Sequence, residues 1–142
     1  MTPRITRTNP PALHRPPGYH HVTVVESSRL AFLAGQCPLD VSGAVVGGND
    51  LDAQIDQVVA NAAVALAAAG AAPEDVVRSV IYVVSDDEDR LAATWRRFCG
   101  SGIAAAFTSA STLLGVARLG FPGQLVELDL TAALWTTAAD RA

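Results

Sequence analysis

The stretch that decides the fold is Leu-Ala-Gly-Gln-Cys-Pro-Leu-Asp, residues 33–40. Two runs of β-branched or apolar residues precede and enter it, 22–26 and 29–34, and the Ser-Ser pair between them predicts a hairpin. Gly35 permits a tight path of the chain after the second run, and Pro38 favours a turn behind it. The chain is therefore expected to leave a β hairpin through a fixed turn.

The residues after this turn predict a long helix. From Leu51 to Ala69, apolar residues recur with a helical period and form one wide face. Asn49 or Asp50 can cap the first amides, and Gly70 can supply the left-handed residue that ends the helix. We expect the apolar face, rich in alanine, to pack closely against a sheet.

The second half of the chain predicts three strands and another helix. Residues 76–84 are almost entirely Val, Ile and Tyr, which is typical of a strand covered on both sides. A capping box at 85–88 and apolar residues at helical spacing then predict a helix from about 86 to 99. Residues 112–119 and 125–134 are the last expected strands.

The order β-β-α-β-α-β-β predicts an α/β (α+β) fold in which both helices cover one face of a single mixed sheet. The other face stays open. Half of the 142 residues are hydrophobic and 17% are charged, which is a large apolar excess for one small domain. We therefore expect partner subunits to cover the open face.

We divide the chain into three parts. Residues 1–18 hold five prolines and read as an arm without regular structure. Residues 19–136 form the domain, and residues 137–142 are a C-terminal tail. The first residues lack the apolar core of a signal peptide, and no apolar run is long enough to span a membrane, so a cytoplasmic protein is expected.

Composition excludes several kinds of chemistry. The chain has a net charge of -4 and no lysine, which argues against nucleic-acid or anionic-membrane binding and removes Schiff-base chemistry. Cys37 and Cys99 lie 62 positions apart with no histidine at metal-ligand spacing. We expect no metal and no other cofactor.

Taken in order, a set of short motifs resembles the YjgF/RidA family, also catalogued as UK114 or L-PSP. The resemblance covers residues 18–134 and implies a fold similar to chorismate mutase. Three sheets would then pack into a central β-barrel, giving a homotrimer with clefts for a small-molecule ligand between its subunits. The motifs that carry the resemblance are Gly35-Gln36, Gln54…Asn61, Ala69-Gly70, the strand at 76–84 and Val116-Ala117-Arg118-Leu119…Glu127.

The resemblance also implies the site. Glu127 matches the glutamate that orients a water or transfers a proton, and Tyr19 matches a tyrosine of the cleft. Hydrolytic members grip the substrate carboxylate with an arginine, where this chain has Ser111. A serine cannot replace a charged, planar fork, so affinity for a carboxylate should fall. We expect Ser111→Ala to leave stability nearly unchanged, and we add Gln36 and Leu113 to the candidate substrate contacts.

For several other residues the sequence favours a structural role over a role in catalysis. The amide of Gln36 is expected to satisfy nearby backbone groups, and Gln54 and Asn61 to anchor neighbouring loops. Cys37 is expected to be a small buried hydrophobe. Either histidine of the pair at 20–21 could donate a proton, although a surface pair is the commoner outcome.

Three functions are compared. The first is a homotrimeric enzyme, a deaminase or hydrolase acting on the C=N or enamine bond of a small labile metabolite, with water activated by Glu127. The second is a non-catalytic trimer that binds a ligand in the same cleft. They differ in whether polar groups converge on the cleft or side chains such as Trp95 and Phe107 fill it. The third, an endoribonuclease, needs a basic groove and ranks last.

Overall fold

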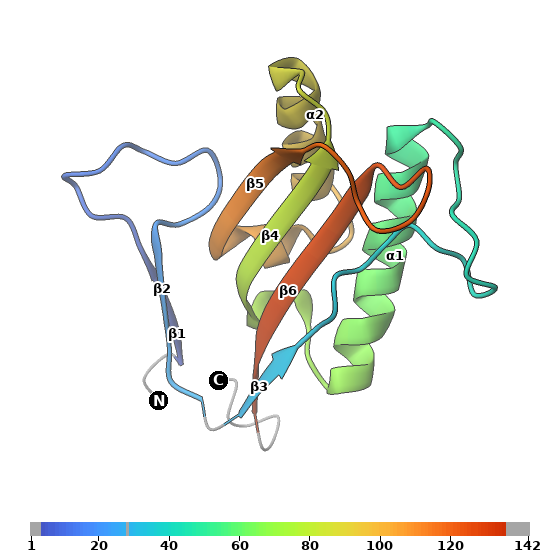
Figure 1. Ribbon diagram of the computed structural model, residues 1–142. Helices are drawn as coiled ribbons and strands as arrows, with labels where there is room; N and C mark the ends of the chain where they lie inside the picture. Colours follow the sequence, from blue (N-terminus) through green and yellow to red (C-terminus); the bar gives the residue numbers. More distant parts are fainter. Residues whose placement is uncertain (1–3, 28, 136–142) are drawn as a thin grey trace.

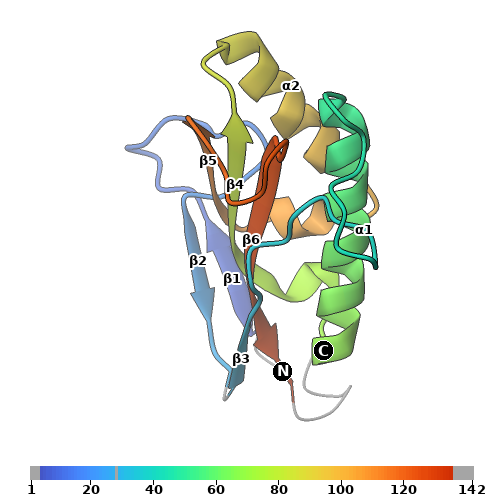
Figure 2. The same ribbon diagram turned by 45° about the vertical axis from the view of Figure 1, so that its right-hand side comes forward.

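The computed structural model describes residues 4–27 and 29–135 and shows a mixed four-stranded sheet in the order β3-β6-β4-β5 (Figure 1). Its strands are β3 (Arg29–Phe32), β4 (Val76–Val84), β5 (Ala110–Val116) and β6 (Val126–Leu134). β4 and β5 run parallel, while β6 is antiparallel to both β3 and β4. Helices α1 and α2 cover one face of this sheet, which confirms the predicted fold class (Figure 2). The predicted tail, 137–142, lies outside the described residues.

Helix α1 (Leu51–Ala69) has the predicted bounds. Asp50, rather than Asn49, is its cap: the carboxylate accepts a hydrogen bond from the amide of Ala53 at 3.1 Å. Gly70 ends the helix with φ of +82°, a conformation that favours glycine. The buried stripe packs on the sheet and consists of Ile55, Val58, Ala62 and Leu66, with Gln54 beside it.

Helix α2 (Glu88–Cys99) begins two residues later than predicted because Asp87, not Ser85, caps it. The Asp87 carboxylate accepts from the amide of Asp89 at 2.9 Å, and the Ser85 hydroxyl accepts from the amide of Asp87 at 3.0 Å. Near the other end of α2, the guanidinium of Arg97 binds both carboxylate oxygens of Asp56 on α1, at 3.0 and 2.8 Å. This ion pair links the two helices on the outside of the molecule.

The predicted N-terminal hairpin is wrong. Strand β2 (Val22–Val25) pairs with β1 (Ile5–Thr8) in a separate two-stranded sheet, and β3 pairs with β6 instead. The arm therefore holds a strand, contrary to the expectation that it lacks regular structure; its residues 1–3 lie outside the described part. Four of its five prolines, Pro10, Pro11, Pro16 and Pro17, lie in the loop between β1 and β2, so they do not interrupt the pairing.

The β1–β2 ribbon is fixed to the domain through Arg7. Its guanidinium donates to the Ser109 hydroxyl and to the Glu74 carbonyl, both at 2.9 Å. Glu74 belongs to the 3₁₀ turn η1 (Pro73–Asp75), and Ser109 follows a second one, η2 (Ala104–Thr108). In addition, the amide of Ala110 donates to the Thr23 hydroxyl of β2 at 2.9 Å. The ribbon thus lies beside the start of β5.

The two faces of the four-stranded sheet differ in chemistry. Ser79, Ile81 and Val83 of β4 point toward the helices and are fully buried. The open face carries Tyr82 of β4 and Phe32 of the edge strand β3, whose exposed fraction is 76%. None of the helices in the described part of the chain has the length and hydropathy that a bilayer span requires.

Candidate functional site

Three of the predicted substrate contacts line one hollow, which we call the Ser111 hollow. Tyr19 comes from the β1–β2 loop, and Ser111 and Leu113 come from β5. Trp95 of α2 closes the hollow, whose volume is about 210 Å³. The hollow opens between α2, β5 and the loop, on the helix side of the sheet. Its other lining residues are Pro17, Leu91, Ala92 and Thr112.

The hydroxyl of Ser111 is held inside the protein. It accepts a hydrogen bond from the buried Ser79 hydroxyl at 2.6 Å and lies 3.0 Å from the carbonyl of Ser109, to which it donates. Both partners belong to the same chain, so its proton is directed at the backbone. The position of the family arginine therefore presents neither a positive charge nor a free donor.

Aromatic rings build the rest of the wall. The indole N–H of Trp95 donates to the carbonyl of Pro17 at 2.9 Å, which fixes the indole against the loop. The Tyr19 ring meets the indole edge to face, with centroids 6.1 Å apart, and its hydroxyl lies 3.2 Å from Nε2 of His14. The hollow is thus mainly apolar, with a few hydroxyl groups at its margin.

Glu127 lies elsewhere in the chain. It pairs with Tyr82 of β4, while Ser111 pairs with Ser79. Residues 79 and 82 of one strand point to opposite faces, so Glu127 is on the open face of the sheet and Ser111 on the helix face. Within one chain the structure does not bring Glu127 together with Tyr19, Ser111 and Leu113.

The carboxylate of Glu127 has its own built surroundings. Its Oε1 accepts from the Cys37 thiol and from the Gln124 amide, each at 3.2 Å. A Cβ at residue 35 would lie 2.5 Å from its Oε2, so glycine is needed for this arrangement. The stretch 33–40 therefore makes room for the carboxylate and contributes one of its donors.

Cys37 has a larger role than a small buried hydrophobe. Burial raises the pKa of its thiol to about 11, and the hydrogen bond and negative charge of Glu127 contribute further. At neutral pH the thiol is protonated and can donate to the carboxylate. Sequence reasoning missed both donors to Glu127. The position of Cys37 directly after the Gly35-Gln36 motif could have indicated that it contacts the site. No motif in the sequence includes Gln124.

Gln36 extends the sheet. Its backbone exchanges hydrogen bonds with Leu128 of β6, at 2.7 and 3.0 Å. Its side-chain amide donates to the carbonyl of Ala34 at 2.9 Å, as expected of a residue that satisfies the backbone. Gln36 therefore lies beside the strand that carries Glu127 and away from the Ser111 hollow. Its role as a substrate contact stays a prediction.

Two polar residues of α1 fix the loops around Glu127, which confirms their predicted role as anchors. Gln54 is fully buried; it donates to the carbonyls of Gly48 and Gly123 and accepts from the amide of Leu125. Asn61 donates to two backbone carbonyls within residues 37–39, at 3.0 and 2.9 Å. These bonds fix the entry to β6 and the stretch that holds Cys37.

The other charged or titratable residues that the sequence points to do not bond to the Glu127 carboxylate. Nδ1 of His20 bonds to the carbonyl of Thr108, and Nε2 of His21 to the carbonyl of His14. Arg118 is exposed beyond β5, which ends at Val116, three residues before its predicted end. Across residues 4–27 and 29–135, His, Cys, Asp and Glu side chains form no group of three that could hold a metal ion.

Comparisons with known proteins agree with this architecture. A Rid-family protein of unknown function from Yersinia pestis, YyfB, is 35% identical, with a TM-score of 0.79 over 92% of this chain and 99% of its own. The yeast protein YEO7 is 25% identical over 93% and 97% of the two chains, with a TM-score of 0.64. A YjgF/YER057c/UK114 family member from Mycobacterium tuberculosis shares the fold, at 24% identity over 92% and 99% and a TM-score of 0.59.

No curated protein sequence matches the chain. The profile of the family described as endoribonuclease L-PSP matches residues 12–134, which is most of the chain and includes β2 to β6. The chain therefore belongs to the endoribonuclease L-PSP family, the YjgF/Rid group of proteins.

Proposed function

We propose that this protein is a cytoplasmic homotrimer that hydrolyses a small imine or enamine lacking a carboxylate, in clefts between its subunits. Family membership fits a role of the imine-deaminase kind. The observation that carries the proposal is the setting of the Glu127 carboxylate. It accepts hydrogen bonds from Cys37 and Gln124 and occupies the space that a side chain at Gly35 would fill. These contacts keep a general base in one orientation on the open face of the sheet.

Assembly would bring together Glu127 and the Ser111 hollow, which lie apart in one chain. The open face carries Glu127 together with exposed apolar side chains such as Phe32 and Leu114. A neighbouring copy packed on that face would place its own groups beside Glu127. In the proposed trimer, each cleft combines the Ser111 hollow of one subunit with Glu127 of the next.

The proposed reaction needs only water and the carboxylate. Glu127 takes a proton from a water molecule as the oxygen attacks the carbon of the C=N bond, and it passes this proton to the nitrogen. The carboxylate then takes the hydroxyl proton of the tetrahedral intermediate and delivers it to the nitrogen as the C–N bond breaks. The products are a carbonyl compound and ammonia, and the carboxylate is left as it began. The hydroxyl groups of Thr112 and of Tyr19, the latter in contact with His14, line the hollow in which the substrate would lie.

The nature of the hollow supports a substrate without a carboxylate. The hydroxyl proton of Ser111 is directed at the carbonyl of Ser109, and the wall around it is largely aromatic or aliphatic. A carboxylate placed there would lose its hydration without gaining a charged partner. An imine carrying an apolar substituent would lose much less.

Ammonia release from freshly generated imines tests this function. Wild type is expected to act on an imine without a carboxylate, and Glu127→Gln to lower the rate by at least about 100-fold because the base is lost. Asp129→Asn is the matched control, since Asp129 lies two residues further along β6 on the same face. Equal rates in wild type and Glu127→Gln would refute the mechanism.

The second candidate is a trimer that binds a ligand without chemistry. The engaged hydroxyl of Ser111 favours it, because no donor in the Ser111 hollow is plainly aimed at a reacting atom. Wild type would then release no ammonia, yet an uncarboxylated amine or ketone would raise its melting temperature. An endoribonuclease activity ranks last, because the chain carries a net charge of -4 and no lysine.

A further inference from the structure

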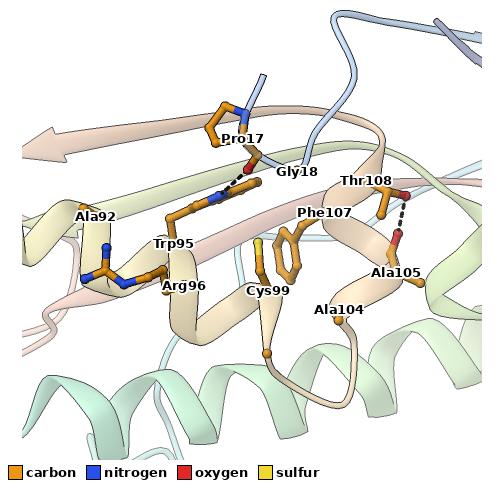
Figure 3. A pocket seen from close by; sticks show the side chains of 11 residues that line it. Pro17, Gly18, Ala92, Trp95, Arg96, Cys99, Ala104, Ala105, Phe107 and Thr108 are labelled. Carbon is orange, nitrogen blue, oxygen red and sulfur yellow. Dashed lines mark hydrogen bonds between the residues drawn. The ribbon is translucent and has the colours of Figure 1, made fainter. Parts of the chain in front are cut away.

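A second, larger hollow lies on the other side of Trp95, and we call it the Trp95 hollow (Figure 3). It has a volume of about 940 Å³ and opens between the end of α2, η2 and the β1–β2 loop. Trp95, Cys99 and Phe107 form its inner wall, Pro17 borders it from the loop, and Arg96 lies at its margin. Glu127, Ser111 and Leu113 do not line it. The function proposed above therefore makes no use of this hollow.

The aromatic wall is already formed in the free protein. The indole of Trp95 is held by its hydrogen bond to Pro17, and its ring meets that of Phe107 edge to face, with centroids 6.0 Å apart. Phe107 is 1% exposed and packs in turn on Phe98, at 5.3 Å between centroids. A ligand that enters the hollow would not have to order these rings, which lowers the cost of binding.

The wall offers little hydrogen bonding. The hydroxyl of Thr108 donates to the carbonyl of Ala105 at 2.9 Å, as Figure 3 shows, so its proton is used within η2. Burial raises the pKa of the Cys99 thiol to about 11, so the thiol is uncharged at neutral pH. The inner surface therefore selects an apolar group.

Arg96 supplies the one charge at this hollow. Its neighbour Arg97 is paired with Asp56 and Asp52 of α1. Arg96 is exposed, and no carboxylate among residues 4–27 and 29–135 pairs with it. None of the described residues that line the hollow is acidic. An apolar wall with an unpaired guanidinium at its margin complements an apolar anion.

We propose that the Trp95 hollow binds a small aromatic carboxylate, with its ring against the indole of Trp95 and its carboxylate on Arg96. The indole is half-buried, and an aromatic ring can meet its exposed part in the edge-to-face arrangement that Phe107 adopts on the buried side. The guanidinium can bind both oxygens of one carboxylate. The volume falls within the range of pockets for small ligands.

Calorimetric titration of the full-length protein with phenylacetate tests the proposal. Phenylacetamide keeps the ring without the charge, and acetate keeps the charge without the ring. Phenylacetate is expected to bind most tightly, and Arg96→Gln to weaken it by roughly tenfold while leaving phenylacetamide unchanged. Arg90→Gln is the matched control: Arg90 is an exposed arginine of the same helix that does not line the hollow.

Ala105→Phe fills the hollow and should abolish binding of both ring compounds. Three binding results overturn the proposal. They are absence of phenylacetate binding at millimolar concentration in wild type, equal affinity in wild type and Arg96→Gln, and binding that survives Ala105→Phe. A change of oligomeric state in Ala105→Phe would also overturn it, because the hollow would then be an interface with a second copy. Because Arg96 is exposed, Arg96→Gln keeps the test valid even if Ala105→Phe fails to fold.

Discussion

At the scale of single residues, Ser111 shows why a substitution read from sequence can mislead. An exposed serine in place of an arginine would be expected to contribute nothing to stability. In the structure its hydroxyl is the acceptor for Ser79, which is fully buried, and its own proton is directed at the backbone. The half-buried residue at the position of the family arginine therefore also bonds to the interior.

We accordingly revise the expectation for Ser111→Ala. The variant should lose about 1–2 kcal/mol in the free energy of unfolding, because the buried Ser79 hydroxyl loses its acceptor. In Ser79→Ala/Ser111→Ala both hydroxyls are gone, so the double variant should lose less than the sum of the two single losses. Urea unfolding of the four proteins measures this coupling. Strict additivity would show that the hydrogen bond contributes nothing.

The two thiols predict a window of alkaline sensitivity. The pKa values of Cys37 and Cys99 are raised from 9.0 to about 11. Between pH 9 and 11 the unfolded chain therefore releases protons that the folded chain keeps, so stability falls as pH rises. Urea midpoints of wild type should decline across this window more steeply than those of Cys37→Ser/Cys99→Ser. Parallel curves for the two proteins would contradict the raised pKa values.

At the scale of elements, the spacing of apolar residues predicted those helices and strands whose bounds depend on nearby residues. The bounds of α1, the position of β4 and the existence of α2 followed from spacing and caps. Strand partners did not follow, since β2 and β3 are adjacent in sequence yet belong to different sheets. Pairing depends on contacts far apart in the chain, such as those of Arg7 with Ser109 and Glu74, which no local pattern contains.

The same limit applies to the site. Tyr19, Ser111 and Leu113 were predicted together and line one hollow. The donors to Glu127 could not be predicted, because Gln124 is oriented by a turn and Cys37 by the loop that Asn61 fixes. Alternation along β6 puts Glu127 on the face opposite the buried residues of that strand, but no local pattern shows that Ser111 faces the other way, since that depends on the register of β4 and β5.

Gln54 is the residue through which α1 controls both loops. Gln54→Ala leaves the carbonyls of Gly48 and Gly123 and the amide of Leu125 without their partner, so it should cost about 3 kcal/mol in the free energy of unfolding. Gln57→Ala is the control from the same helix, because the amide of Gln57 donates to a side chain, that of Asn61. Its loss should be below about 1 kcal/mol in urea unfolding. Equal losses would refute the anchoring role of Gln54.

At the scale of the whole molecule, the proposed assembly depends on the open face of the sheet. Leu30 and Phe32 of β3 and Leu114 of β5 are 44%, 76% and 44% exposed, and their strand partners Ala133, Thr131 and Tyr82 place them all on this face. Exposed apolar side chains at both edges of one face of a sheet are typical of a surface that another subunit covers. Assembly and activity are therefore expected to fail together.

Phe32→Glu should convert the proposed trimer into monomers, because it puts a charge into the proposed interface. Val64→Glu is the matched control: Val64 is 71% exposed on α1, away from the open face, so this variant should remain trimeric. Sedimentation velocity distinguishes the two states. A Phe32→Glu protein that sediments like wild type would mean that the open face is not the interface.

The most direct test of the central claim compares wild type with Ser111→Arg on two imines, one with a carboxylate, of the 2-iminobutyrate type, and one without. We predict that wild type releases ammonia faster from the uncarboxylated imine. Ser111→Arg should reverse this preference, because the guanidinium supplies the missing partner for a carboxylate. A wild-type protein that prefers the carboxylated imine, with a preference that Ser111→Arg leaves unchanged, would contradict the account.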